Sequence, residues 1–222
     1  MKNTPKLIVM LTHNDLTVPD AREIFEGCKD AAAEAWGFKE EPLPRREMAE
    51  LFAYMKRCGK ETFLEVVAYS EEEGLAGAET AYECGCDCLM GTLFYDSIND
   101  FCKKRGLRYM PFAGEVSGRP SVLSGSIDGM TAEANALLEK GVYGFDLLGY
   151  RYTGDAAELC RRFVAEVKAP VCIAGSINSF ARLDEVKKAA PAAFTIGGAF
   201  FEGRFGSGFA RQINDVCRYM KG

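Results

Sequence analysis

The segments VCIAGSIN (residues 171–178) and FTIGGAF (residues 194–200) decide the fold. Each is a short apolar run, typical of a buried strand, that ends in glycine and precedes a helical pattern. Because glycine lets the backbone approach a ligand closely, N–H groups at such turns can point at an anion. Two such turns on the last two strands of a (βα)8 barrel form a common phosphate site. We therefore expect them to hold the phosphate of a small molecule.

Strand and helix patterns alternate along the whole chain. Strand-like runs are expected at 6–12, 35–39, 62–68, 87–91, 108–112, 143–148, 171–174 and 194–196. Helical patterns follow them at 18–33, 44–58, 71–84, 96–105, 131–140, 155–167, 179–189 and 207–220. Eight βα units in 222 residues predict an α/β fold, a single-domain (βα)8 TIM barrel over residues 1–222. A doubly wound open sheet is the alternative, but no dinucleotide-binding loop follows the first strand.

The composition is that of an ordinary globular protein, with 48% hydrophobic and 27% charged residues. A net charge of −5 without a basic stripe argues against a nucleic-acid partner. No apolar run is long enough to cross a membrane, and we see no signal peptide, so we expect a cytoplasmic protein. The nine cysteines are interpreted as reduced, buried thiols.

Four side chains are candidates for acid–base chemistry, because they fall at or near the expected carboxyl ends of strands. Glu65 and Asp146 lie within apolar strands, where a carboxylate is costly to bury unless it is paired or functional. Lys39 is opposite in phase to Trp36 and to its other apolar neighbour on that strand, so it should face the barrel mouth as a base, a Schiff-base amine or an anion partner. His13 is the only histidine and can act as an acid or a base.

The remaining candidates would hold the substrate. We expect phosphate contacts from five residues of the two glycine turns: Gly175, Ser176, Asn178, Gly197 and Gly198. Glu115 and Arg119 lie in the irregular segment 113–130, which is interpreted as a binding loop or a surface excursion. Arg151 follows the sixth strand, and either arginine can grip a carboxylate or phosphate through two hydrogen bonds. Asp15 is either a ligand-binding residue or ordinary turn chemistry.

With the two turns in place, the chain resembles the ribulose-phosphate-binding barrel superfamily. IAGSIN (173–178) and TIGGAF (195–200) are similar to that superfamily's phosphate motifs. Its members include ribulose-phosphate and acylmannosamine-phosphate epimerases, hexulose-phosphate synthases and keto-sugar-phosphate decarboxylases, and aldolases of phosphorylated keto-deoxy acids have a related barrel. The resemblance implies a phosphorylated ligand and leaves the reaction open.

No named subfamily matches throughout. The decarboxylases and synthases carry Asp-x-Lys-x-x-Asp on the third strand, where this chain has FLEVVA (63–68) with no lysine. The acylmannosamine-phosphate epimerases carry a glutamate where Ala174 stands, and Schiff-base aldolases often carry a lysine on the sixth strand, which here offers Asp146. Residues 63–90 are also similar to part of quinolinate phosphoribosyltransferase barrels, although those enzymes have an additional N-terminal domain.

These observations predict an enzyme that binds a phosphorylated sugar or keto acid and transfers a proton next to a carbonyl. It would be an epimerase, an isomerase or an aldolase-type lyase. The alternatives are a quinolinate phosphoribosyltransferase-like barrel and a non-catalytic phosphosugar sensor. We expect no metal site, although paired carboxylates leave a bound Mg²⁺ open. The aromatic stretch 200–209 either forms a homodimer interface or covers the barrel's own rim.

Overall fold

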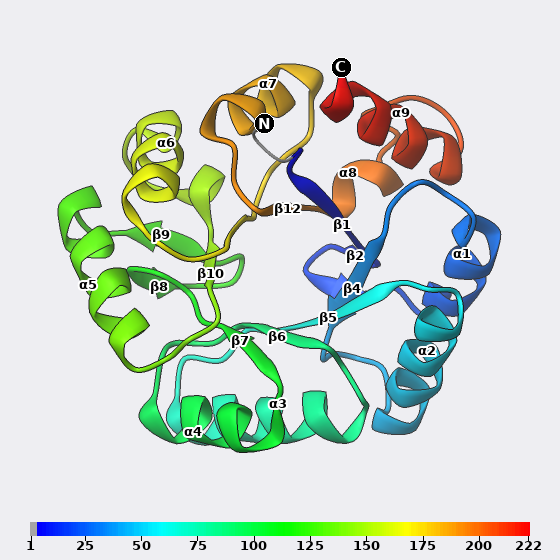
Figure 1. Cartoon of the computed structure of the whole chain (residues 1–222). Helices are drawn as coiled ribbons and strands as arrows, with labels where there is room; N and C mark the ends of the chain where they lie inside the picture. The colour runs from blue at the N-terminus through cyan, green and yellow to red at the C-terminus, as the bar shows by residue number, and fades with distance from the viewer. Residues whose placement is uncertain (1–3) are drawn as a thin grey trace.

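Eight parallel strands form the centre of the molecule, and helices surround them (Figure 1). The computed structural model describes residues 4–222. In spatial order the strands are β10, β11, β12, β1, β4, β5, β6 and β7. Their bounds are Lys6–Met10 (β1), Ala35–Lys39 (β4), Glu61–Val66 (β5), Cys88–Gly91 (β6), Arg108–Met110 (β7), Phe145–Leu147 (β10), Val171–Ile173 (β11) and Ala193–Ile196 (β12).

The ring closes between β7 and β10. The Asp146 N–H donates to the Pro111 carbonyl at 2.9 Å, and the Tyr143 N–H donates to the Tyr109 carbonyl at 3.1 Å. The surrounding helices are Ala21–Cys28 (α1), Arg45–Arg57 (α2), Glu71–Glu83 (α3), Asp96–Arg105 (α4), Ile127–Glu139 (α5), Ala156–Glu166 (α6), Phe180–Ala189 (α7), Gly198–Phe201 (α8) and Phe209–Lys221 (α9). The predicted single-domain TIM barrel is confirmed.

Alternation along each strand divides the core into an inner and an outer layer. The inner cluster fills the barrel with residues from six strands: Ile8, Met10, Ala35, Phe63, Cys88, Met90, Met110 and Cys172. The outer layer packs under the helices, as where Phe38 of β4 stacks on Phe52 of α2 at 4.3 Å between ring centroids. This places Phe38 outside and its neighbour Lys39 inside, as the phase of the strand predicts.

The predicted first helix is too long at both ends. Val18 belongs to the base of a hairpin made by β2 (Thr12–His13) and β3 (Leu16–Thr17), because its N–H donates to the Leu11 carbonyl at 3.0 Å. After α1 the chain leaves helical geometry, and the Ala32 N–H donates instead to the Asn214 side chain of α9 at 2.8 Å. Tertiary contacts therefore override the helical pattern at both ends.

The segment 113–130, expected to be irregular, contains regular structure. Glu115–Ser117 (β8) and Val122–Ser124 (β9) pair as an antiparallel hairpin. Helix α5 then begins at Ile127, four residues before the predicted start. The reason is Ser126, whose hydroxyl accepts a hydrogen bond from the Gly129 N–H at 3.1 Å and caps the helix.

The aromatic residues after β12 pack on one another. Phe200 lies 5.7 Å from Phe205 and 5.6 Å from Phe209, and Phe201 lies 4.9 Å from Phe209, measured between ring centroids. Phe200 and Phe205 are buried. These rings therefore cover the barrel's own rim where α8 meets α9, and a homodimer stays a prediction.

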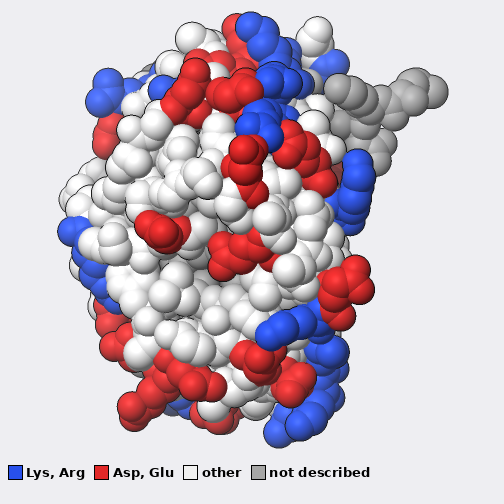
Figure 2. All heavy atoms as spheres, turned by 90° about the vertical axis from the view of Figure 1, so that its left-hand side faces the viewer, with Lys and Arg blue, Asp and Glu red and all other residues white. Residues whose placement is uncertain are grey.

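The outer surface carries charges of both signs. Figure 2 faces the α5 and α6 side of Figure 1, where acidic and basic side chains are interspersed with uncharged surface. Within residues 4–222, none of the helices combines the length and the apolar character needed to cross a bilayer.

One polar side chain lies fully inside the barrel. Asp146 of β10 has no solvent-exposed surface, and neither carboxyl oxygen has a hydrogen-bond partner among the described residues. Burial, reinforced by the charge of Glu65, raises the pKa of Asp146 well above its ordinary value. The group is therefore held as a neutral carboxylic acid, because an unpaired charge here would be very costly.

We expect Asp146→Asn to change how stability depends on pH. Because the pKa of Asp146 is raised in the folded state, its stabilising contribution is complete below about pH 4. That contribution is lost as the pH rises, whereas asparagine stays neutral. The unfolding free energy of Asp146→Asn, relative to that of wild type, should therefore increase as the pH rises from 4 to 8.5. Urea denaturation at each pH measures both values. Asp100→Asn, on the exposed face of α4, is the control. Parallel curves for Asp146→Asn and wild type would contradict the burial of an uncompensated carboxyl group.

Candidate functional site

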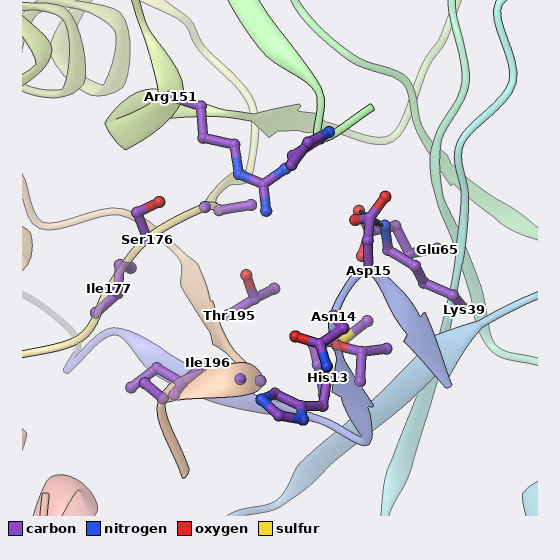
Figure 3. A pocket seen from close by; sticks show the side chains of 18 of the residues that line it. His13, Asn14, Asp15, Lys39, Glu65, Arg151, Ser176, Ile177, Thr195 and Ile196 are labelled. Carbon is purple, nitrogen blue, oxygen red and sulfur yellow. Dashed lines mark hydrogen bonds and ion pairs between the residues drawn. The ribbon is translucent and has the colours of Figure 1, made fainter. Parts of the chain in front are cut away.

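A cavity of about 680 Å³ opens at the carboxyl ends of the barrel strands (Figure 3). Its walls come from β1, the β2–β3 hairpin, β4, β5, the tip of the β8–β9 hairpin, the short 3-10 helix η1 (Gly149–Arg151), and the turns that follow β11 and β12. All of these segments meet at one end of the barrel, where the side chains that extend past the apolar interior can be polar.

The turn after β11 lines the cavity with residues 174–178. Gly175 and Ser176 both have positive φ angles, +83° and +53°, so the chain reverses sharply here. No described residue accepts a hydrogen bond from the N–H groups of residues 175–178. The hydroxyl of Ser179 caps α7 by accepting from the Arg182 N–H at 3.2 Å, so the Asn178 side chain is not needed as a cap.

The turn after β12 forms the adjoining wall. The N–H groups of Gly197, Gly198 and Ala199 likewise have no acceptor within residues 4–222. A Cβ on Gly197 would lie 2.6 Å from the hydroxyl oxygen of Thr12, so this glycine is required by packing against β2. A Cβ on Gly198 would meet nothing closer than 3.6 Å, so its position is open on the cavity side. Together the two turns supply seven backbone donors without partners.

Arg151 adds a positive charge beside these amides. Its stem packs on Gly175, where a Cβ would lie 2.8 Å from Arg151 Cγ, and this close approach requires glycine. The guanidinium points into the cavity between Ser176 and the Asp15–Lys39 pair (Figure 3). It donates to the Ser121 carbonyl at 3.5 Å and pairs with no carboxylate of residues 4–222. The amide turns and Arg151 make this end of the cavity suitable for an anion.

The opposite end of the cavity holds a buried lysine between two carboxylates. Lys39 Nζ lies 2.5 Å from Asp15 Oδ1 and 3.8 Å from Glu65 Oε1. Its backbone is fixed by the Thr17 hydroxyl, which donates to the Lys39 carbonyl at 2.7 Å and accepts from the Lys39 N–H at 2.9 Å. Burial lowers the pKa of Lys39, but Glu65 and Asp15 outweigh it and raise that pKa above its ordinary value. Lys39 is therefore an ammonium ion at neutral pH.

The predicted site residues divide into those that the cavity brings together and those that it does not. Cavity-lining positions are occupied by His13, Lys39, Glu65, Arg119, Arg151, Gly175, Ser176, Asn178, Gly197 and Gly198. Asp146 is not among them, because it lies in the barrel interior without exposed surface. Glu115 is exposed on β8, where its carboxylate accepts from the Ser124 hydroxyl at 3.2 Å. The geometry therefore does not support substrate contacts by Glu115 or Asp146.

The contacts of His13 and Arg119 could not be predicted from the sequence. The His13 ring stacks on Phe201 of α8 with 5.5 Å between centroids, which places it at the β12 turn and away from Lys39 (Figure 3). Arg119, at the tip of the β8–β9 hairpin, donates to the Val67 carbonyl at 2.8 Å and lies 3.8 Å from the Glu41 carboxylate. It thus ties the hairpin to the end of β5.

Several residues that line the cavity were not predicted from the sequence. Asn14, Thr195 and Glu202 line the cavity. Thr195 lies two residues before Gly197, near the end of a predicted strand, and this position could have identified it. Glu40 follows Lys39 but lies outside the cavity wall, where its side chain accepts a hydrogen bond from the Val67 N–H at 3.2 Å. Burial raises the pKa of Glu40 to about 7. The sequence around Glu40 does not distinguish it, because the polar run that follows β4 resembles an ordinary loop.

The described residues do not fit the Mg²⁺ that paired carboxylates left open. Residues 4–222 contain no cluster of three or more His, Cys, Asp or Glu side chains arranged to hold a metal ion. The two carboxylates of the cavity, Asp15 and Glu65, already face Lys39. No step of the chemistry below is therefore assigned to a metal.

No family model matches this sequence, and no curated protein matches it. Solved structures with the same fold include orotidine 5'-phosphate decarboxylase from Pyrococcus horikoshii OT3, at a TM-score of 0.71 and 13% identity over 97% of this chain and 99% of that chain. N-acetylmannosamine-6-phosphate 2-epimerase from Clostridium perfringens matches at 0.63 and 15%, over 87% and 86% of the two chains. The 4-hydroxy-2-oxoglutarate aldolase/2-deydro-3-deoxyphosphogluconate aldolase from TTHB1 matches at 0.64 and 15%, over 97% and 92%. The chain therefore shares the (βα)8 barrel fold with these solved structures.

Proposed function

We propose that this protein is an enzyme that binds a phosphorylated sugar or keto acid and transfers a proton next to its carbonyl group. The observation that carries the proposal is the division of one cavity into two ends. One end has seven backbone donors without partners beside Arg151, and the other has a carboxylate beside a buried ammonium ion. An anchored anion and a nearby acid–base pair are what such a reaction needs.

The anion end supports a phosphate rather than a neutral group. Backbone N–H groups and a guanidinium are all donors, and they cost little reorganisation because the fold fixes them before the ligand arrives. Asn178 and Ser176 add neutral donors at the rim of the same turn. Binding energy gained at a phosphate that does not react can hold the reacting carbons in place at the far end.

The other end supports proton transfer. Glu65 would remove the proton from the carbon next to the carbonyl, and the electron pair would move to the carbonyl oxygen to form an enediolate. Lys39, 3.8 Å from Glu65, is a fixed cation that can stabilise the negative oxygen as it develops. Returning the proton from Glu65 to the neighbouring carbon gives isomerisation, and protonation of the same carbon by water on its opposite face gives epimerisation. In a lyase, Glu65 would instead remove the proton of a β-hydroxyl group, and the electron pair of the broken carbon–carbon bond would move to the carbonyl oxygen.

Gly198→Asp should abolish binding of inorganic phosphate without unfolding the protein. The new side chain would have room for its Cβ but would place a carboxylate among the amide donors of the β12 turn. Losing one or more charge-assisted hydrogen bonds and adding repulsion should weaken the affinity by about 100-fold or more. Isothermal titration calorimetry measures the affinity, and thermal melting monitors the fold.

The matched control is Gly27→Asp. Gly27 lies in α1, where an added Cβ meets nothing within 4 Å, and it is not part of the cavity wall. It introduces the same charge on the outer ring of helices. Equal phosphate affinity in Gly198→Asp and Gly27→Asp would argue against an anion site at the two turns.

Glu65→Gln should lower kcat by roughly 100-fold to 10,000-fold on a sugar phosphate that the enzyme turns over, because the base is lost. KM should change little, since the phosphate anchor stays intact. A panel of phosphorylated aldoses, ketoses and keto acids, followed by NMR detection of deuterium exchange next to the carbonyl, provides the assay. Binding of panel members by wild type without any exchange or cleavage would favour the non-catalytic sensor instead.

A further inference from the structure

The position of His13 separates it from the acid–base end of the cavity. Its ring lies nearly parallel to Phe201, with 19° between the ring planes, and Phe201 belongs to the helix that follows the β12 turn. A Cβ on Gly198 would lie 3.6 Å from His13 Cδ2, so the edge of the imidazole borders the amide donors of that turn. The close-up shows the ring beside the end of β12, on the far side of the cavity from Glu65 (Figure 3).

The imidazole has no competing partner among the described residues. No hydrogen bond or ion pair joins its nitrogens to a side chain or backbone group of residues 4–222, although the residue is partly buried. The neighbouring carboxylates are occupied. Asp15, in the same hairpin, pairs with Lys39 at 2.5 Å, and Glu202, at the end of α8, pairs with Arg204 at 2.8 Å. The ring nitrogens are therefore available to a ligand.

We propose that His13 is an anion-binding residue, whose imidazolium ion donates a hydrogen bond to the phosphate held by the β12 turn. The inference rests on the anion site proposed above and reassigns His13 from the acid–base chemistry predicted for it. The hairpin that carries His13 would then form a third wall of the phosphate site, opposite Arg151. Stacking on Phe201 holds the ring in the orientation that this contact needs.

A consequence is that anion affinity should depend on pH. Imidazole side chains change charge between about pH 5 and 8, and only the charged form donates from both nitrogens. The charged groups near His13 are Glu202, whose Oε1 lies 3.9 Å from the same Gly198 Cβ position and which pairs with Arg204, and Asp15 in its own hairpin, which pairs with Lys39. Glu40 also titrates near pH 7, but it lies outside the cavity wall.

Sulfate is the appropriate probe, because it remains a dianion throughout this pH range and any pH dependence then comes from the protein. We would measure sulfate affinity by calorimetry at pH 5.5, 6.5, 7.5 and 8.5. Wild type should lose about tenfold in affinity or more between the lowest and highest pH, the loss of one charge-assisted hydrogen bond. His13→Asn should bind at every pH with the weaker affinity that wild type shows at pH 8.5.

Two further variants separate His13 from other causes. His13→Arg keeps a planar cation that can stack on Phe201, so it should retain tight sulfate binding at pH 8.5. Glu40→Gln removes the carboxyl group whose pKa is about 7 and should leave the pH dependence of wild type unchanged. Thermal melting of each variant confirms that the comparison is between folded proteins.

The outcomes are distinct. A pH dependence that persists in His13→Asn, or that disappears in Glu40→Gln, would overturn the assignment of His13 while leaving the anion site in place. Sulfate binding by wild type that does not vary with pH would do the same. Absence of sulfate binding by wild type at every pH would overturn the anion site itself, and the proposed function with it.

Discussion

A closed parallel sheet must bury both of its faces, and this constraint governs where polar chemistry can occur in the molecule. The inner face is filled with apolar and sulfur-containing side chains such as Ile8, Phe63 and Met110, and the outer face packs under the helices. Polar groups inside the ring are tolerated only near the carboxyl ends of the strands, where the cavity opens. Asp146, which lies deeper, is the exception and remains neutral as a result.

The polar groups at this end of the barrel are of two kinds, and each kind comes from different strands. The last two strands supply backbone donors, since both are followed by glycine turns whose N–H groups have no acceptor among residues 4–222. Strands β4 and β5, two and three places from β12 in the ring, supply the side chains Lys39 and Glu65. The separation of the proposed anion site from the proposed acid–base pair thus follows from the strand order, and the cavity of about 680 Å³ is lined by both.

The sequence predicted the barrel and most of the cavity wall because both depend on local patterns. Strand phase placed Lys39 inside, and glycine spacing located the two turns. Prediction from the sequence failed where the surroundings of a side chain depend on contacts between segments that are distant along the chain. Asp15 is ordinary turn chemistry until β3 docks on β4 and brings its carboxylate to Lys39. Asp146 and Glu65 share the same apolar strand pattern, and only the depth of each along its strand distinguishes a buried acid from a cavity-lining one.

The environment of Lys39 decides among the three roles that its position allows. A Schiff-base amine must lose its proton before it can attack a carbonyl, and a general base must also be neutral. Two carboxylates hold Lys39 in its charged form and outweigh the effect of burial. Asp15 and Glu65 therefore keep Lys39 charged, which favours stabilisation of a negative oxygen over nucleophilic attack. The sixth strand also lacks the interior lysine that Schiff-base aldolases often carry. Together with the charged state of Lys39, this favours enediolate chemistry without a covalent intermediate.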